Sequence, residues 1–156
     1  MPRGRSVKKR KIAPDAIYDN VLIQRFINKI MKKGKKNKAE IIVYSALEKA
    51  GEKLKVAPLD VFEKIISTLT PSLEVKARRV GGATYQVPVE VSVLRGQAMA
   101  MKWLYDVCAE KKGKSMSDKL TVELVDAYNG TGNAIRKKDD LHKTAQANRA
   151  FAHFRW

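Results

Sequence analysis

The side chains with the clearest chemical potential in this sequence are clustered lysines, which bind phosphates. Six lysines fall within ten residues: Lys29, Lys32, Lys33, Lys35, Lys36 and Lys38. They surround the predicted end of a helix, at Gly34. The helix dipole would attract one or two cations there, but not six. The cluster therefore favours a phosphate-contacting loop over a loop that is merely solvated.

A second cationic group lies on a predicted β-hairpin at about residues 74–91. There Val, Thr and Tyr alternate with polar residues on either side of Gly81-Gly82, and two adjacent glycines accept the positive φ of a tight turn. With both glycines at the turn centre, the opposed pairs are Arg78 with Tyr85, Lys76 with Val87, Arg79 with Thr84, and Ala77 with Gln86.

Neither face of this hairpin is apolar, and a lone two-stranded hairpin is marginal in water. We therefore expect it to project from the helices and to find support on a partner. The alternative is an ordinary hairpin, packed at its base and solvated at its tip. Arg78, Arg79 and Tyr85 are of the types that grip phosphates and stack on bases.

The two ends of the chain carry further cations. Residues 1–12 hold six basic residues and no acid, which predicts a flexible arm that orders on RNA, or else a solubilising tail. The last residues interleave aromatic rings with His153 and Arg155, at Phe151, Phe154 and Trp156. This pattern suits stacking on RNA and docking onto the core equally well.

Groups for catalysis or metal binding are sparse. Cys108 is the only cysteine, so it forms no internal disulfide, and it lies among apolar residues as a core residue would. One Cys and two His do not supply the four ligands of a structural zinc site. No Gly-Lys-Ser/Thr follows Gly81-Gly82, so there is no P-loop. We expect neither an enzyme nor a metal or cofactor.

The charge and the length of the chain limit the classes of function that it can have. The 156 residues include 32 Lys and Arg against 16 Asp and Glu, a net charge of +16. The excess positive charges of a compact domain repel one another, and a polyanionic partner would reduce this repulsion. Nucleic acid is the first candidate for that partner and an anionic membrane the second. No apolar run is long enough to span a bilayer, and no signal peptide is expected. One cysteine fits a reducing compartment.

Apolar residues at helical spacing predict the elements that position these cations. The class is mainly α: a single domain at 13–156 with six helices, one hairpin protruding between the third and fourth, and a basic arm at 1–12. The helices are expected from Asp19 or Asn20 to Gly34, from an Asn37–Glu40 capping box to about Gly51, from Pro58 to Pro71, from about 95–97 to Gly113, from Ser115 to Gly130, and over about 133–152.

Two long stretches resemble a known family. VGGATYQVPVEV at 80–91 resembles the hairpin signature of bacterial small-subunit ribosomal protein seven, and HKTAQANRAFAHFRW at 142–156 resembles the C-terminal sequence of that family. The order of elements is similar from about residue 2 to residue 156. One departure is SVLRGQ at 92–97, where family members often carry more arginine. Arg95 stands alone there, beside a Gly96 that would loosen the helix start.

The resemblance implies a structural protein of the cytoplasmic ribosome that binds small-subunit ribosomal RNA directly and nucleates assembly of its head. It also implies exit-site transfer RNA and messenger RNA nearby, neighbouring small-subunit proteins as partners, and no membrane. It does not separate a bacterial protein from an organelle-encoded one. Carried over by residue, the RNA-contacting positions are Lys8, Arg10, Lys35, Lys36, Lys76, Arg78, Arg79 and Arg95, with Tyr85, Phe154 and Trp156 as candidates for stacking.

Three other classes of protein would show different sequence features. A DNA-binding regulator is the main alternative, because helix pairs with short turns suit a helix-turn-helix. Its cations would gather on one recognition helix, whereas here they are spread over arm, loop and hairpin. An RNA-modifying enzyme would need a nucleophile, a metal or a cofactor motif. A membrane-surface protein would need one helix with a basic face opposite a strongly apolar one.

Overall fold

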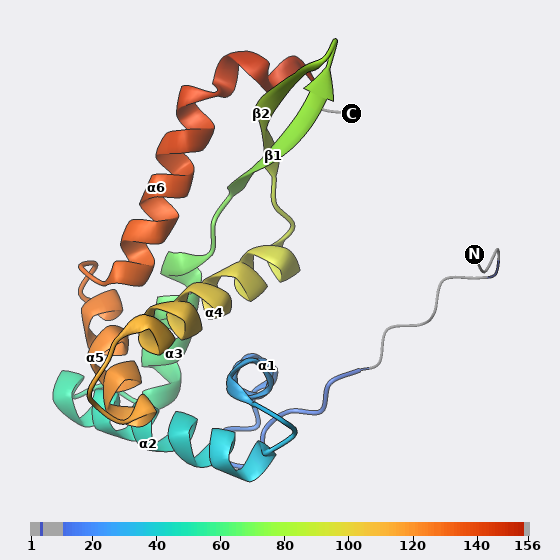
Figure 1. The fold of residues 1–156 in the computed structure, drawn as a ribbon. Helices are drawn as coiled ribbons and strands as arrows, with labels where there is room; N and C mark the ends of the chain where they lie inside the picture. Colours follow the sequence, from blue (N-terminus) through green and yellow to red (C-terminus); the bar gives the residue numbers. More distant parts are fainter. Residues whose placement is uncertain (1–3, 5–10, 155–156) are drawn as a thin grey trace.

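The computed structural model describes Gly4 and residues 11–154, and over this part it is mainly helical, as expected. The elements are α1 (Val21–Ile30), α2 (Lys36–Leu54), α3 (Pro58–Leu69), β1 (Leu73–Val80), β2 (Ala83–Glu90), α4 (Val93–Glu110), α5 (Met116–Tyr128), α6 (Asn133–Ala147) and the 3-10 helix η1 (Arg149–Phe154). Figure 1 shows α1–α5 gathered at one end, with the β1–β2 hairpin rising from them beside α6.

One aliphatic core holds the helical body together. The apolar stripes of α1, α2 and α3 face one another and the inner faces of α4 and α5. Phe26 and Phe62, both fully buried, meet with ring centres 5.4 Å apart. Close packing of this kind fixes the relative positions of the helices, and so of the loops between them.

Three helix starts were predicted correctly from local sequence signals. The Asn20 side chain accepts a hydrogen bond from the backbone N–H of Leu22 and caps α1. Pro58 is the first residue of α3, where its missing N–H costs nothing. The Ser115 hydroxyl accepts from the N–H of Asp118 and caps α5. These three starts confirm the sequence predictions.

Other helix boundaries were predicted wrongly. The first helix ends at Ile30 rather than Gly34, because the backbone turns away at Met31 and takes positive φ at Lys33 and Gly34. The Asn37–Glu40 capping box does not form, because α2 has already begun at Lys36. Helix α2 also runs past Gly51 to Leu54.

Helix α4 begins two residues earlier than the predicted range, at Val93, so Gly96 lies inside it. Gly96 is buried against the chain that joins α3 to β1: a Cβ there would lie 2.7 Å from Thr70 Cγ2 and 3.1 Å from the Pro71 carbonyl oxygen. The glycine therefore permits a close approach instead of loosening the helix start.

The hairpin has the predicted register. Arg78 pairs with Tyr85, Lys76 with Val87, Arg79 with Thr84 and Ala77 with Gln86, and both turn glycines have positive φ. Part of the support for the hairpin, which the sequence assigned to a partner, comes from the chain itself. Helix α6 runs beside β1, and η1 packs on β2 (Figure 1).

The last predicted helix is two elements. Helix α6 stops at Ala147, and after Asn148 the chain tightens into η1. This break turns Phe151 and Phe154 toward Tyr85 of the hairpin, with ring centres 5.1 and 5.2 Å from it.

Candidate nucleic-acid interface

The first basic region is the α1–α2 loop with the start of α2. Positive φ at Lys33 and Gly34 reverses the chain, so that Lys35 occupies the N-cap position of α2. No side chain caps this end, and the first turn of α2 holds no acid. Lys36 forms a 3.4 Å ion pair with Glu40. Within residues 11–154, Lys35 makes no ion pair with a carboxylate, and neither does Lys38.

The sequence placed these lysines in a loop after the first helix, with the second helix capped at Asn37, slightly later than α2 begins. Three of them, Lys35, Lys36 and Lys38, instead lie at the N-terminal end of α2. A helix N-terminus carries partial positive charge and unpaired N–H groups, so it repels cations and attracts anions. The lysines and the helix end therefore concentrate positive charge in one region.

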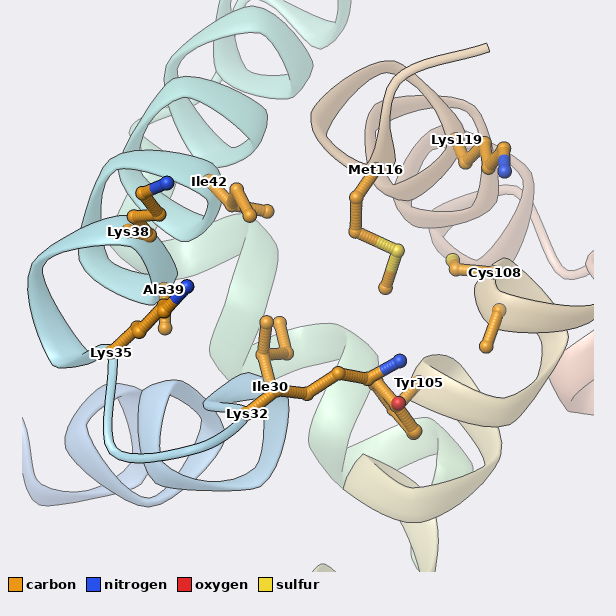
Figure 2. A pocket seen from close by; sticks show the side chains of 11 residues that line it. Ile30, Lys32, Lys35, Lys38, Ala39, Ile42, Tyr105, Cys108, Met116 and Lys119 are labelled. Atoms are coloured by element: carbon orange, nitrogen blue, oxygen red, sulfur yellow. The ribbon is translucent and has the colours of Figure 1, made fainter. Parts of the chain in front are cut away.

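A pocket of about 350 Å³ lies beside this loop, between α2, α4 and α5 (Figure 2). Its apolar lining includes Ile30, Ala39, Ile42, Tyr105, Cys108 and Met116, and four lysines stand around it: Lys32, Lys35, Lys38 and Lys119. The Lys32 ammonium lies 5.6 Å from the centre of the Tyr105 ring. The pocket thus combines apolar walls with a cationic rim.

The second basic region is organised around one buried carboxylate on the hairpin. Glu74 is 5% exposed and binds two cations: the Lys76 ammonium at 3.0 Å and the Arg95 guanidinium at 2.7 Å, through both Nε and a terminal nitrogen. Burial would raise the pKa of Glu74, but the hydrogen bonds from Arg95 and Lys76 outweigh it and hold the pKa below its usual value. Glu74 therefore fixes Lys76 and Arg95 relative to each other.

The other predicted hairpin residues differ in exposure. Arg79 is exposed, while Arg78 is half-buried beside its partner Tyr85. The Tyr85 ring packs against Phe151 and Phe154, so the C-terminal aromatic residues dock on the hairpin. Of the two readings left open for these rings, docking is observed, although onto the hairpin instead of the helical core. Lys8, Arg10 and Trp156 lie outside the described residues.

The structure does not bring all predicted site residues together. Lys35 and Lys36 lie at the loop, near the C-terminal half of α4, whereas Arg95 lies in the first turn of α4 and shares Glu74 with Lys76. Arg79 lies farther out, near the turn of the hairpin. The candidate interface is therefore two basic regions joined by α4.

Sequence reasoning missed Glu74 and the pocket residues Tyr105 and Met116. Glu74 had a local signal, as an acid at the start of the basic strand EVKARR. Nothing in the sequence indicated the role of Glu123. This carboxylate is fully buried and accepts hydrogen bonds from the Lys111 ammonium at 2.7 Å and from the Ala134 N–H at 2.8 Å. Glu123 thereby ties the end of α4 and the start of α6 to α5.

Cys108 and the possible metal ligands are the remaining candidates for other chemistry in the described part of the chain. Cys108 is fully buried, and burial together with nearby Glu123 raises the pKa of its thiol to about 12, so it is a core residue. Over Gly4 and 11–154, no three His, Cys, Asp or Glu side chains are grouped so as to hold a metal ion. Within those same residues, no helix has the length and apolar character needed to cross a bilayer.

Comparison with known proteins gives consistent matches along the whole chain. The family model described as "Ribosomal protein S7p/S5e" matches residues 2–149. The chain is 51% identical over 156 residues to the small ribosomal subunit protein uS7 of Dictyoglomus turgidum, covering all of both chains. It is 54% identical over 154 residues to uS7 of Chloroflexus aggregans, covering 99% of this chain and 98% of that one.

Proposed function

The chain belongs to the ribosomal protein S7p/S5e family, whose members are structural, non-enzymatic proteins of the small ribosomal subunit. On that premise we propose that it binds the RNA of the small subunit directly. The proposal places the protein in the ribosome, in the cytoplasm. There it nucleates folding of the head of the small subunit and contacts neighbouring ribosomal proteins.

The observation that carries the proposal is the arrangement of cations on a rigid body. At the loop, Lys35 and Lys38 stand without carboxylate partners among the described residues, at an uncapped helix N-terminus. At the hairpin, Glu74 holds Lys76 and Arg95 in place. Fixed cations displace condensed counterions from RNA, which gives affinity without sequence readout.

The mechanism is therefore positional. The major groove of an RNA duplex is too deep and narrow for side chains to read, so recognition rests on the shape of a folded junction and on unpaired bases. Because the two basic regions are joined by α4, they match only an RNA whose phosphates have the corresponding spacing. The projecting hairpin is the element proposed to lie near the exit-site transfer RNA and the messenger RNA exit path.

The test is binding of the full chain to the isolated head domain of small-subunit ribosomal RNA at a series of salt concentrations. Duplex DNA and transfer RNA serve as competitors. We expect binding that survives both competitors and falls steeply with salt, with a slope corresponding to roughly six or more phosphates. Arg78→Ala/Arg79→Ala should weaken it by on the order of 1 kcal/mol for each arginine.

A matched control is Lys53→Ala/Lys143→Ala, which removes the same charge from two exposed lysines outside both basic regions. It should bind nearly as the wild type does. Equal binding of the wild type to all three nucleic acids would make the chain a generic polycation. Preference for duplex DNA would favour the regulator alternative instead.

A further inference from the structure

The pocket beside the α1–α2 loop is an apolar hollow with four lysines among its lining residues. Ile30, Ala39 and Cys108 are buried and line its inner part, while Tyr105 and Met116 are half-buried. Figure 2 shows Met116 and Ile42 pointing into the space between α2, α4 and α5. Its inner surface offers dispersion contacts and an aromatic ring, but few hydrogen-bonding groups.

The rim has the opposite character. Lys35 reaches it from the N-cap position of α2, Lys38 from the first turn of α2, Lys32 from the loop and Lys119 from α5. The eleven lining residues include no carboxylate, so no acid within the pocket offsets these charges. The positive N-terminal end of α2 adds to them. The occupant that complements this pocket is therefore flat and apolar in one part and anionic in the next.

An unpaired nucleotide has that chemistry, because its base is a planar apolar face and its phosphates are anionic. A volume of about 350 Å³ lies near the lower end of the range of about 300–1,000 Å³ for small-ligand pockets, which suits one base better than several. The Met116 thioether is flexible and polarizable, so it can adapt to the edge of a ring. An acidic apolar peptide is the competing occupant, and the test below separates it from a base.

We propose that this pocket receives one unpaired base of the bound RNA, with the flanking phosphates held by Lys35 and Lys38. The proposal rests on the RNA binding proposed above and adds a base-specific contact to it. Aromatic and apolar surfaces that stack on single-stranded bases commonly accompany cations that track the backbone. The lysines alone would recognise only phosphate, whereas the pocket requires a base.

The experiment is missing-base interference with the full-length protein. Head-domain RNA is depurinated or depyrimidinated at random, mixed with the protein, and separated into bound and free fractions. We expect the loss of one unpaired base to weaken wild-type binding about tenfold, as the loss of one stacked base should. This measurement needs no protein variant, so it is independent of any effect of mutation on folding.

The variant that assigns this base to the pocket is Ala109→Phe. Ala109 is exposed on α4 and lines the pocket, so a phenyl ring there should occupy the space without disturbing the core. We expect about tenfold weaker binding to intact RNA, an unchanged salt slope, and no further loss when the critical base is missing. Ala147→Phe makes the same change at an exposed position of α6 that does not line the pocket, and it should behave as wild type.

The outcomes separate the two proposals. If the wild type binds the RNA specifically but no base loss is suppressed by Ala109→Phe, the base pocket is overturned and the RNA-binding function stands. If Ala109→Phe instead blocks capture of an acidic protein segment and leaves RNA binding intact, the occupant is a peptide and the proposal is wrong. If the wild type does not bind the RNA, both proposals fail.

Discussion

At the scale of single residues, buried carboxylates decide which cations are held in place. Glu74 fixes Lys76 and Arg95, and Glu123 fixes Lys111. A buried carboxylate needs such partners, because desolvation disfavours its charge. In a chain of net charge +16, Glu74 and Glu123 therefore each hold basic side chains in a defined position.

The pH dependence of stability tests the role of Glu74. Its pKa is lower in the folded protein than its ordinary value of 4.5, so its contribution is present above pH 4.5 and is lost as pH falls through the folded pKa. Glu74→Gln should destabilise the protein by about 1 kcal/mol at pH 7, because its partners are partly exposed, and the difference from wild type should shrink as the pH falls below 4.5. Urea unfolding at pH 7 and at pH 3 measures this change.

A matched control is Glu52→Gln, at an exposed glutamate that forms no ion pair within residues 11–154. It should change stability little at either pH. A deficit of Glu74→Gln that stayed constant from pH 7 to pH 3 would show that the carboxylate charge is not what matters at this position.

At the scale of elements, close approaches set where helices sit. Helix α4 reaches the α3–β1 connection only because Gly96 has no side chain. The Thr70 hydroxyl donates a hydrogen bond of 2.6 Å to the Ile66 carbonyl oxygen. Because this bond holds the Thr70 side chain in one rotamer, its Cγ2 methyl cannot rotate away from position 96. The start of α4, which carries Arg95, is thereby placed against the base of the hairpin.

Gly96→Ala should therefore destabilise the protein, although alanine is the better helix former. The helix propensity gain is at most about 1 kcal/mol, and overpacking costs about 1–3 kcal/mol. We expect a net loss of up to about 2 kcal/mol in the free energy of unfolding, measured with urea. A more stable Gly96→Ala variant would contradict the close approach.

Thr70→Ser provides the matching rescue. It removes the methyl that a Cβ at position 96 would meet at 2.7 Å and keeps the hydroxyl. The double variant should recover part of the loss, since the Pro71 carbonyl at 3.1 Å remains. A double-mutant cycle isolates this coupling.

At the scale of the whole molecule, the two basic regions lie at opposite ends of α4 (Figure 1). Lys35→Ala/Lys38→Ala and Lys76→Ala/Arg79→Ala should each weaken RNA binding by on the order of 1 kcal/mol per cation. Because the sites are distant and share no partner, their effects should add within about 0.5 kcal/mol in the combined variant. Binding titrations at one fixed salt concentration measure all three variants.

The salt slope gives a second reading of the same variants. It should fall by roughly 0.7–0.9 for each phosphate contact that is removed. A combined loss far from the sum would mean that both regions contact one RNA element, or that one region positions the other.

Short-range features could be predicted from the sequence. The Gly81-Gly82 turn dictates the hairpin register, because the opposed pairs follow once the two central residues are known. The caps at Asn20 and Ser115 and the start at Pro58 are likewise local. The mainly α class follows from apolar residues at helical spacing, whose burial drives the core together.

Features that join distant parts of the chain depended on the tertiary structure. Glu74 and Arg95 are 21 positions apart, and the pocket draws on residues from Ile30 to Lys119. The break after α6 that docks η1 on the hairpin follows from the ring contacts of Tyr85. Hydrogen bonds within a turn or cap are set by neighbouring residues, whereas pockets, buried ion pairs and close helix contacts exist only when packing brings separated residues together.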